Sequence, residues 1–371
     1  MSRPVAPPLY RLKRATNWLA SPRVLHWLLP ALMLLIAVGT VAQKYDGLYV
    51  AEKTYFSSLI IWLFDVIPLP GGYTLMGLFA LSLLLKFLLK SEWKRQRIGI
   101  NLAHFGVLLL FVGGIVSSLL AEDGSMTIPE GATMRSVHDF HKRDVMLVQG
   151  SALLATLPAD TLRAGTTHKL PGLPVQLEVL EACRNCRIAA RESADDALRS
   201  MARGMMLSPA APEKNDEANT GGMTFRLTGV SAEADGTYIL FEDGPTAKFS
   251  IDGQDYELAY GKSQRPLPFA VELKDFVRTN YPGTNNAKAY HSDVIIHDGM
   301  LSWPARIEMN QPLRYRGYTL YQSAFIDTPE KEMTVLAVSR DDGQFIPYLG
   351  TLIMGLGLLL HLFIRKAGEA P

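Results

Sequence analysis

Long apolar stretches divide the chain into a membrane part and a soluble part. A membrane-spanning helix needs roughly 20 mostly apolar residues, and four stretches come close: 24–42, 73–89, 98–121 and 345–364. Lys86 lies near the end of the second stretch, where its ammonium group can extend to the lipid headgroups. No small-residue cleavage site follows the first stretch, so we expect it to remain as an anchor. The pattern predicts four transmembrane helices.

A shorter apolar run lies between the first two predicted spans, within residues 45–70. Its core, Leu59 to Ile67, is apolar for nine residues but carries Asp65 and runs into a Pro- and Gly-rich stretch. This run is too short to cross a bilayer. Because tyrosine and tryptophan side chains are frequent in the segment, we expect it to lie along the outer membrane surface.

The basic residues indicate how the four predicted spans are oriented. They gather before the first span, between the second and third, and after the fourth, so all three groups fall on one side. Short loops rich in Lys and Arg remain cytoplasmic. We therefore expect cytoplasmic ends at 1–23 and 365–371 and a translocated domain at 122–344. In a bacterium this places the spans in the inner membrane and the domain in the periplasm.

The translocated domain shows the short alternating pattern of half-buried β-strands. Examples are Val175 to Leu180, Met223 to Leu227, Thr237 to Phe241, Phe269 to Leu273, Asp293 to Ile296 and Tyr318 to Gln322. No long helical period separates them, so the pattern favours a mostly antiparallel sandwich or open barrel. Residues 191–222 are rich in Ala, Ser, Pro and charge, which predicts a short helix followed by a mobile loop.

Charge and cysteine content exclude several classes of protein. The 37 Lys and Arg residues nearly balance the 36 Asp and Glu residues, so nucleic acid is not an expected partner. Two cysteines in 371 residues cannot form a disulfide scaffold. They leave one bridge or one dithiol site.

Three histidines, His26, His104 and His361, lie in or beside predicted spans. By helical rise His104 lies roughly 9 Å inside the third span, and the other two lie closer to the cytoplasmic surface. Intramembrane polar residues are costly and often functional, and a neutral imidazole is a suitable axial ligand for haem iron. For His26 and His361, interfacial placement or an interhelical hydrogen bond explains the residue equally well.

Glycines share the predicted helix with His104, at positions 99, 106, 113 and 114. They would allow close approach of another helix or of a flat macrocycle. Both alternatives remain open from the sequence.

Cys183 and Cys186 form a CxxC pair (CRNC) in the outer domain, where oxidation is expected. The pair fits a local structural disulfide or a redox dithiol whose thiolates Arg184 and Arg187 would stabilise. A metal site would need further ligands. Covalent haem attachment would need a histidine where the chain has Arg187.

His138 and His141 (HDFH) form a second candidate pair, just beyond the third span. On a helix they would share one face and could bind a metal or haem. A solvated surface position is the more frequent role of such a pair.

The order of features resembles the ResB (CcsB) family of the System II cytochrome c maturation machinery. The similarity lies in RIGINLAHFGVLLLFVGGIVSS of the third span, in LKDFVRTNYPGTNNAKAYHSDVIIHDG, and in IEMNQPLRYRGYTLYQSAF. The last segment matches the family signature N-x-PL-x-Y-x-GY-x-x-YQSSF, here between Asn310 and Phe325. A structural role for this signature, fixing the last hairpin of the domain, is an alternative to haem contact.

The resemblance implies a function that periodicity alone does not. Such chains pair with a polytopic ResC/CcsA-type partner, and the complex carries haem outward and joins its vinyl groups to CxxCH thiols of apocytochrome c. His104 would then be the ligand of a transient, non-covalent b-type haem, and the chain would be an incomplete catalyst with no catalytic residue of its own. A thioredoxin-like reductant becomes a further partner if the CxxC pair is redox-active. The alternatives are a membrane-anchored thiol oxidoreductase and a b-type electron-transfer cytochrome.

Overall fold

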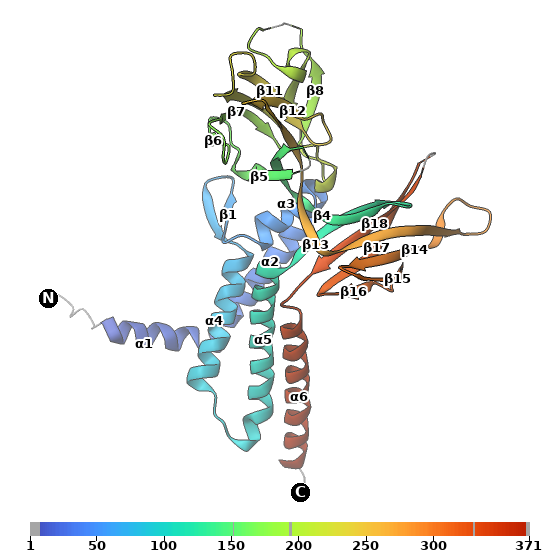
Figure 1. Ribbon diagram of the computed structural model, residues 1–371. Helices are drawn as coiled ribbons and strands as arrows, with labels where there is room; N and C mark the ends of the chain where they lie inside the picture. The colour runs from blue at the N-terminus through green and yellow to red at the C-terminus, as the bar shows by residue number, and fades with distance from the viewer. Residues whose placement is uncertain (1–7, 151, 193–194, 329–330, 369–371) are drawn as a thin grey trace, which may run out of the picture. The chain divides into compact units, whose positions relative to one another are not determined.

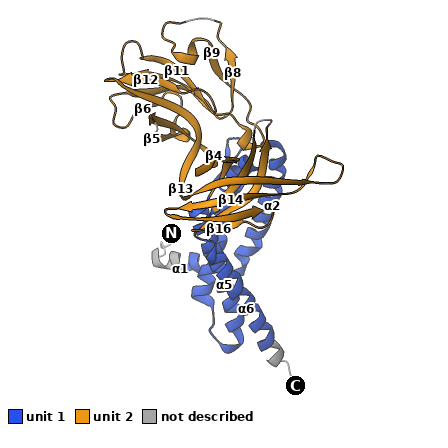
Figure 2. Cartoon of the chain, turned by 45° about the vertical axis from the view of Figure 1, so that its right-hand side comes forward, with its two compact units in different colours: residues 1–122, 340–371 blue, residues 123–339 orange. Residues whose placement is uncertain are grey.

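The computed structural model describes residues 8–150, 152–192, 195–328 and 331–368, and the chain forms two compact units (Figures 1 and 2). The helical unit comprises residues 1–122 and 340–371, and the β unit comprises 123–339. The start of the predicted N-terminal segment 1–23 and the end of the predicted tail 365–371 lie outside the described residues. Each unit is described below by itself.

Four described helices of the helical unit are long and apolar enough to cross a membrane. They are α2 (Pro22–Asp46), α4 (Gly72–Lys90), α5 (Ile98–Leu120) and α6 (Phe345–Gly368). These helices confirm the four predicted spans. Each begins within a few residues of the predicted start, because the apolar run of the sequence determines which part of the chain can be buried in hydrocarbon.

A further helix, α1 (Pro8–Leu19), precedes the first span where only a basic N-terminal segment was expected. Backbone carbonyls at its end accept hydrogen bonds from α4 side chains. Ser82 Oγ donates to the Leu19 carbonyl at 2.7 Å, and Lys90 Nζ donates to the Asn17 carbonyl at 3.1 Å. The end of α1 is therefore tied to the last two turns of α4.

The predicted interfacial segment 45–70 contains ordered elements. It begins with the end of α2 and continues through α3 (Leu48–Ala51), a π-helical turn (Glu52–Phe56) and a hairpin of β1 (Ile60–Leu63) and β2 (Ile67–Pro70). Large apolar side chains of the hairpin are exposed. Its position at the membrane surface stays a prediction.

Helices α5 and α6 pack with their backbones in close contact. A Cβ atom added to Gly106 would lie 2.5 Å from the backbone nitrogen of Met354, and one added to Gly99 would lie 2.4 Å from the backbone nitrogen of His361. Gly113 fits against Pro347 in the same way. Small residues allow such packing in membranes, where dispersion contacts rather than water exclusion drive helix association.

The β unit contains a ten-stranded sheet, a four-stranded sheet and a two-stranded sheet among its described residues. The paired strands whose register is described run antiparallel, as predicted. The strands are β3 (Glu122–Pro129), β4 (Thr133–Gln149), β5 (Ala152–Pro158), β6 (Thr167–Lys169), β7 (Gln176–Cys183), β8 (Cys186–Ala190), β9 (Met205–Pro209), β10 (Gly222–Thr228), β11 (Gly236–Phe241), β12 (Ala247–Ile251), β13 (Gln254–Asn280), β14 (Ala287–Asp298), β15 (Leu301–Glu308), β16 (Leu313–Tyr315), β17 (Tyr318–Asp327) and β18 (Glu332–Arg340).

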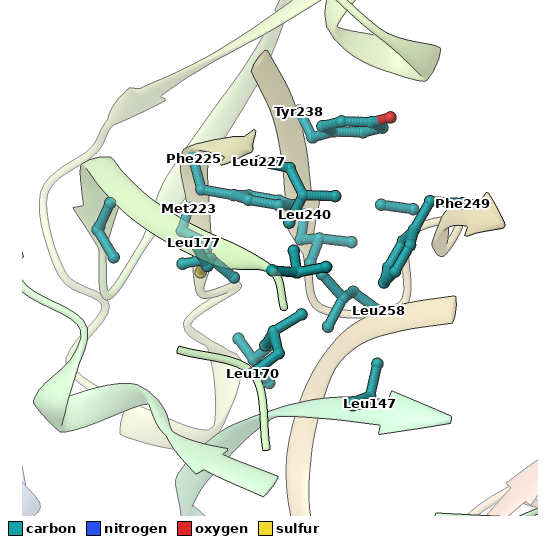
Figure 3. Packing of buried hydrophobic residues seen from close by; sticks show 14 of the residues in the cluster. Leu147, Leu170, Leu177, Met223, Phe225, Leu227, Tyr238, Leu240, Phe249 and Leu258 are labelled. Atoms are coloured by element: carbon teal, nitrogen blue, oxygen red, sulfur yellow. The ribbon is translucent and has the colours of Figure 1, made fainter. Parts of the chain in front are cut away.

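Two separate hydrophobic cores form in this unit. In the sandwich core, Leu177 and Phe225 of the four-stranded sheet face Leu147 and Leu258 of the ten-stranded sheet (Figure 3). The curled core is formed within the ten-stranded sheet, by side chains of β3, β4, β13, β14, β15, β17 and β18. Phe269 is fully buried among them. The long strands β4 and β13 contribute to both cores, so they join the two halves of the unit (Figure 1).

The pairing of β4 with β13 breaks between the two cores. Arg143 lies opposite Lys262, but the next described pair is His138 with Gln264, so four residues of β4 face a single residue of β13. The extra residues form a bulge at the point where neither core covers the strands. Polar side chains gather there, and we call them the junction network.

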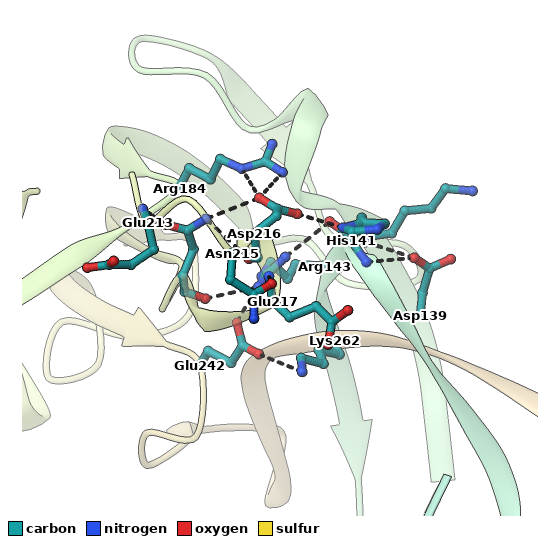
Figure 4. A network of polar contacts seen from close by, with 12 residues as sticks. Asp139, His141, Arg143, Arg184, Glu213, Asn215, Asp216, Glu217, Glu242 and Lys262 are labelled. Carbon is teal, nitrogen blue, oxygen red and sulfur yellow. Dashed lines mark hydrogen bonds and ion pairs between the residues drawn. The ribbon is translucent and has the colours of Figure 1, made fainter. Parts of the chain in front are cut away.

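The junction network contains a buried ion pair and a buried carboxylate with partly exposed partners (Figure 4). Arg143 Nε donates to Glu242 Oε2 at 2.8 Å, and their side chains are only 5% and 9% exposed. Asp216, 3% exposed, accepts from Arg184 Nε at 2.7 Å and lies 2.7 Å from His141 Nδ1. Its remaining members are Asp139, Asn219 and Lys262.

Residues 191–222 differ from the predicted mobile loop. Apart from 193–194, which are not described, the segment contains 3-10 turns at Ser200–Arg203 and Asp216–Ala218 and strand β9, which pairs with β8. The low hydrophobicity that predicted a loop is offset by hydrogen bonds. Asn219 and Asp216 are buried because distant parts of the unit supply their polar partners.

Adding one methyl group to Gly106 tests the α5–α6 contact. We expect Gly106→Ala to lower the denaturation midpoint of the full chain in detergent, since the new Cβ atom would collide with the α6 backbone. Gly77→Ala in α4 is the matched control, because nothing lies within 4 Å of its added Cβ. The control should be neutral or stabilise by up to about 1 kcal/mol. Equal behaviour of the two variants would contradict the described packing.

The junction network predicts a pH-dependent contribution from Asp216. Burial acts to raise the pKa of this carboxyl, but hydrogen bonds from Arg184 and His141 outweigh burial and lower the pKa below its usual value. The carboxylate therefore stabilises the fold above the ordinary aspartate pKa of about 3.9, and this stability is lost as pH falls through the lowered value.

We expect Asp216→Asn to cost about 1–3 kcal/mol near neutral pH, because the hydrogen bonds from Arg184 and His141 would lose their charged acceptor. The difference from the parent chain should shrink as the pH falls below 4. Urea denaturation of the full chain in detergent across this range measures it. The exposed neighbour Glu217→Gln is the control, and a deficit that does not change with pH would show that the Asp216 charge does not stabilise the fold.

Candidate functional site

His104 lies on a face of α5 that points away from α6. The glycines that contact α6, at positions 99, 106 and 113, lie on nearly the opposite side of the helix. Each residue turns the helix by about 100°, which places these three glycines more than a right angle away from His104. The face of His104 continues through Val107, Phe111 and Ile115, at the spacing of successive helical turns. His104 is half-buried.

An apolar hollow of about 450 Å³ opens along this face, between α4 and α5. Its lining includes Val107 and Phe111 from α5 and Met76 and Phe79 from α4. The hollow begins one helical turn from His104, and Gly114 forms part of its wall. An imidazole at one end of an apolar hollow is an arrangement that can hold a flat apolar molecule and coordinate its metal.

The sequence left open whether the glycines of α5 allow close approach of another helix or of a flat macrocycle. The structure divides them between these two roles. Gly99, Gly106 and Gly113 contact α6, so their role is close approach of a helix. A Cβ atom added to Gly114 would meet nothing within 4 Å, and this residue lines the hollow instead. Only Gly114 lies where a macrocycle would need space.

His26 and His361 do not gather around His104. His361 lies on α6 at the level of Gly99, on the α6 side of α5, and its buried Nδ1 has no hydrogen-bond partner among the described residues. His26 is exposed on α2, where its Nδ1 lies 2.9 Å from the Pro22 carbonyl. A role of either histidine in haem binding stays a prediction.

His138 and His141 lie on strand β4 rather than on a helix, and they have different surroundings. His141 belongs to the junction network through Asp216. His138 is half-buried at the edge of the bulge, where burial first and the Lys262 ammonium second lower the pKa of its imidazole. No group of three His, Cys, Asp or Glu residues in the described chain is arranged to hold a metal ion.

Cys183 and Cys186 form a disulfide at the turn between β7 and β8. Cys186 is buried in a small cluster with Leu207 and Ile239, and Cys183 packs against the same cluster. The two residues between the cysteines both serve the fold. Arg184 binds Asp216, and Asn185 donates from Nδ2 to the Ala211 carbonyl at 2.7 Å.

Sequence reasoning did not find that the CRNC and HDFH motifs meet at Asp216. This residue lies in the segment expected to be a loop, and it accepts from Arg184 of one motif and contacts His141 of the other. No local spacing signals the contact. The hollow beside His104 was also missed, although the spacing of His104, Val107 and Phe111 could have indicated a common helical face.

The late signature, Asn310 to Phe325, forms the hairpin of β16 and β17 and packs into the curled core. Asn310, Arg316 and Gly317 have positive φ angles of 66°, 49° and 81°, and the last two form the two-residue turn of this hairpin. Phe325 packs on Phe276 with ring centroids 5.4 Å apart. The prediction that this is the last hairpin of the domain is wrong, because strand β18 follows it.

Gln322 of the signature occupies a buried polar site in the curled core. Its Oε1 accepts from Ser292 Oγ at 2.6 Å, and its Nε2 donates to Thr334 Oγ1 at 2.9 Å. All three side chains are buried. These contacts fix the register of β17 between its neighbours, so they favour the structural role of the signature.

Comparisons with known proteins agree with the resemblance noted in the sequence. Residues 220–335, which run from the edge of β10 into β18, match the model of the ResB-like family. The chain is also similar to Protein NrfI of Wolinella succinogenes, with 37% identity over 114 residues. The aligned part is 30% of this chain and 12% of that protein, so the chain covers only a small part of this relative's length.

The two matches agree with the arrangement of the fold. The family match includes the signature hairpin and most strands of the curled core, and four apolar helices accompany this mostly antiparallel domain. A region similar to the ResB-like family, residues 220–335, therefore lies in a chain that also has four described helices apolar enough to span a membrane.

Proposed function

We propose that this chain is a haem-handling subunit of a cytochrome c synthetase. It holds haem in transit, as a non-covalent b-type complex, and works with a ResC/CcsA-type polytopic partner that attaches the haem to the CxxCH thiols of apocytochrome c. The observation that carries the proposal is the position of His104 inside a predicted span, at the end of the apolar hollow between α4 and α5. The match of residues 220–335 to the ResB-like family model supports it.

The residues fit haem as the cargo of this site. A neutral His104 imidazole can offer one ring nitrogen to iron, and the half-buried position of the ring limits its access to water. Haem supplies the iron that the imidazole coordinates and the vinyl groups to which the apocytochrome thiols add. The residues of this chain would bind the haem, orient it and exclude water from its apolar faces.

The chain would not complete the reaction alone. His361 lies on the other side of α5, so a second axial ligand would come from the partner. The five tryptophans are scattered along the sequence and form no haem-handling motif. This distribution supports a division of labour in which the partner supplies the second ligand and the attachment site.

The basic residues support one orientation in the membrane. Arg95 and Arg97 lie in the connection between α4 and α5, and α1 with Lys13 and Arg14 is tied to the same end of α4. By the positive-inside rule this end faces the cytoplasm. Both termini would then be cytoplasmic, the β unit would be periplasmic, and His104 would lie near the side from which haem enters.

Removal of His104 tests the proposal. We expect His104→Ala, in the complex with the partner, to lose the b-type haem spectrum and most cytochrome c maturation, because iron loses an axial ligand. His104→Gly should regain the spectrum when imidazole is added, since free imidazole can fill the vacated space.

His168→Ala is the matched control, because this histidine lies on β6 outside the predicted spans, where its Nε2 contacts Thr166 Oγ1. It should keep its haem. Full haem occupancy together with normal maturation in His104→Ala would refute the proposal.

An electron-transfer cytochrome is not favoured by the histidine positions. Cross-membrane transfer through two b haems would use four ligands in two stacked pairs. His104 and His361 lie on different faces of α5 and at different levels, so the described helices do not bring them together as a pair.

A thiol oxidoreductase is tested by removing the disulfide. We expect Cys183→Ala with Cys186→Ala to lower the stability of the chain by about 2 kcal/mol, the loop-closure contribution of so short a bridge. Cytochrome maturation at low temperature should persist, because the bridge packs in an apolar cluster and supports Arg184. Thermal denaturation and a maturation assay measure the two effects. Loss of maturation with unchanged stability would instead assign the pair, and a thioredoxin-like reductant, to the reaction.

A further inference from the structure

Lys86 is a cation inside a predicted span, four residues before the end of α4. Lys90 donates to the Asn17 carbonyl, and Lys94 and Arg97 pair with Glu92 at 2.9 and 3.5 Å. Within the described part of the chain, no hydrogen bond or ion pair involves the Lys86 ammonium group, although its side chain is half-buried. A charged side chain in a span is costly and marks a functional site by default.

The aromatic contacts between α4 and α5 place Lys86 at the level of His104. The rings of Phe87 and Phe105 stack with centroids 5.9 Å apart, and those of Phe79 and Phe111 lie 5.4 Å apart. These pairs set the antiparallel register of the two helices. Lys86 directly precedes Phe87 and His104 directly precedes Phe105, so the two residues lie at similar depth.

The α4–α5 face therefore presents three kinds of group in order along the helices. A cation and an imidazole lie at one level, and the apolar hollow begins one helical turn further along, at Val107. A molecule that uses all three needs an anionic edge, a metal that accepts an imidazole nitrogen, and an apolar body. Haem has these parts, since its propionates lie on one edge of an otherwise apolar macrocycle.

We propose that Lys86 is a positioning residue that binds a propionate of the haem coordinated by His104. This inference rests on the proposed function and adds the group that sets the direction in which the macrocycle lies. The propionate edge points to the end of the helices that carries Lys86, and the apolar body lies in the hollow. In a medium of low dielectric constant the pair gains far more than an exposed ion pair would.

A lipid phosphate offers the same anionic chemistry, and haem esters separate the two sources. The full chain in nanodiscs is titrated with haem and with haem dimethyl ester, whose propionates carry no charge, while the Soret band reports binding. We expect Lys86→Met to weaken haem binding by about tenfold, the effect of one charge-assisted hydrogen bond. The same substitution should leave binding of the ester unchanged.

Three further variants complete the design. Lys86→Gln should reproduce the loss with a polar side chain, which guards against a packing defect of the methionine, and Lys86→Arg should retain most of the affinity. Lys90→Met removes a lysine one turn away whose ammonium group already binds a carbonyl, and it should bind haem as the parent does. His104→Ala should weaken haem and ester alike, because it removes the iron ligand.

The outcomes separate failure of this inference from failure of the proposed function. If Lys86→Met and Lys86→Gln bind haem as tightly as the parent, Lys86 serves lipid phosphate and the inference is overturned while His104 can still be the ligand. Equal weakening of haem and ester by both Lys86 variants also overturns it, since the lost contact would not involve propionate. If His104→Ala leaves the Soret band and affinity unchanged, or if the parent chain binds neither compound, the proposed function falls together with the inference.

Discussion

Direct backbone contact between α5 and α6 is the constraint on which the rest of this structure depends. Glycines at 99, 106 and 113 let the two helices approach without intervening side chains. Helix α5 leads into β3, the first strand of the β unit, and β18, the last strand, leads into α6. In the ten-stranded sheet β3 and β18 are neighbours. Within the helical unit, the α5–α6 contact leaves the face of His104 turned away from α6 and toward the hollow beside α4.

In the β unit, two hydrophobic cores share one pair of strands. Strands β4 and β13 are continuous from one core to the other, and at the crossing point they have no apolar layer to cover them. A buried ion pair of Arg143 and Glu242 occupies this point, and the buried carboxylate of Asp216 meets the exposed side chain of Arg184. Removing one member of such a pair is far more costly than exchanging both, so the network specifies one arrangement of the two halves.

The sequence predicted those features that follow from local composition. The four spans, and the strands around Phe225, Phe269 and Leu320, were predictable because each carries its own apolar run or alternation. Helix α1 was missed because its basic residues obscure a short amphipathic pattern. Asp216 could not be identified, since its partners are distant in sequence and its segment resembles a solvated loop. His104 was recognisable from its depth in a span, whereas the hollow beside it depends on how α4 packs.

The two neighbours of α5 differ in how they close against it, and this difference determines how a bound molecule could exchange. Helix α6 meets α5 backbone to backbone, whereas α4 meets it through aromatic side chains and leaves the hollow open on one side. A molecule in that hollow can be reached laterally, from the plane of the bilayer, with no need for a water-filled channel. Its residence time would then be governed by rotation of side chains such as Phe79 and Met76, while the α5–α6 pair remains intact.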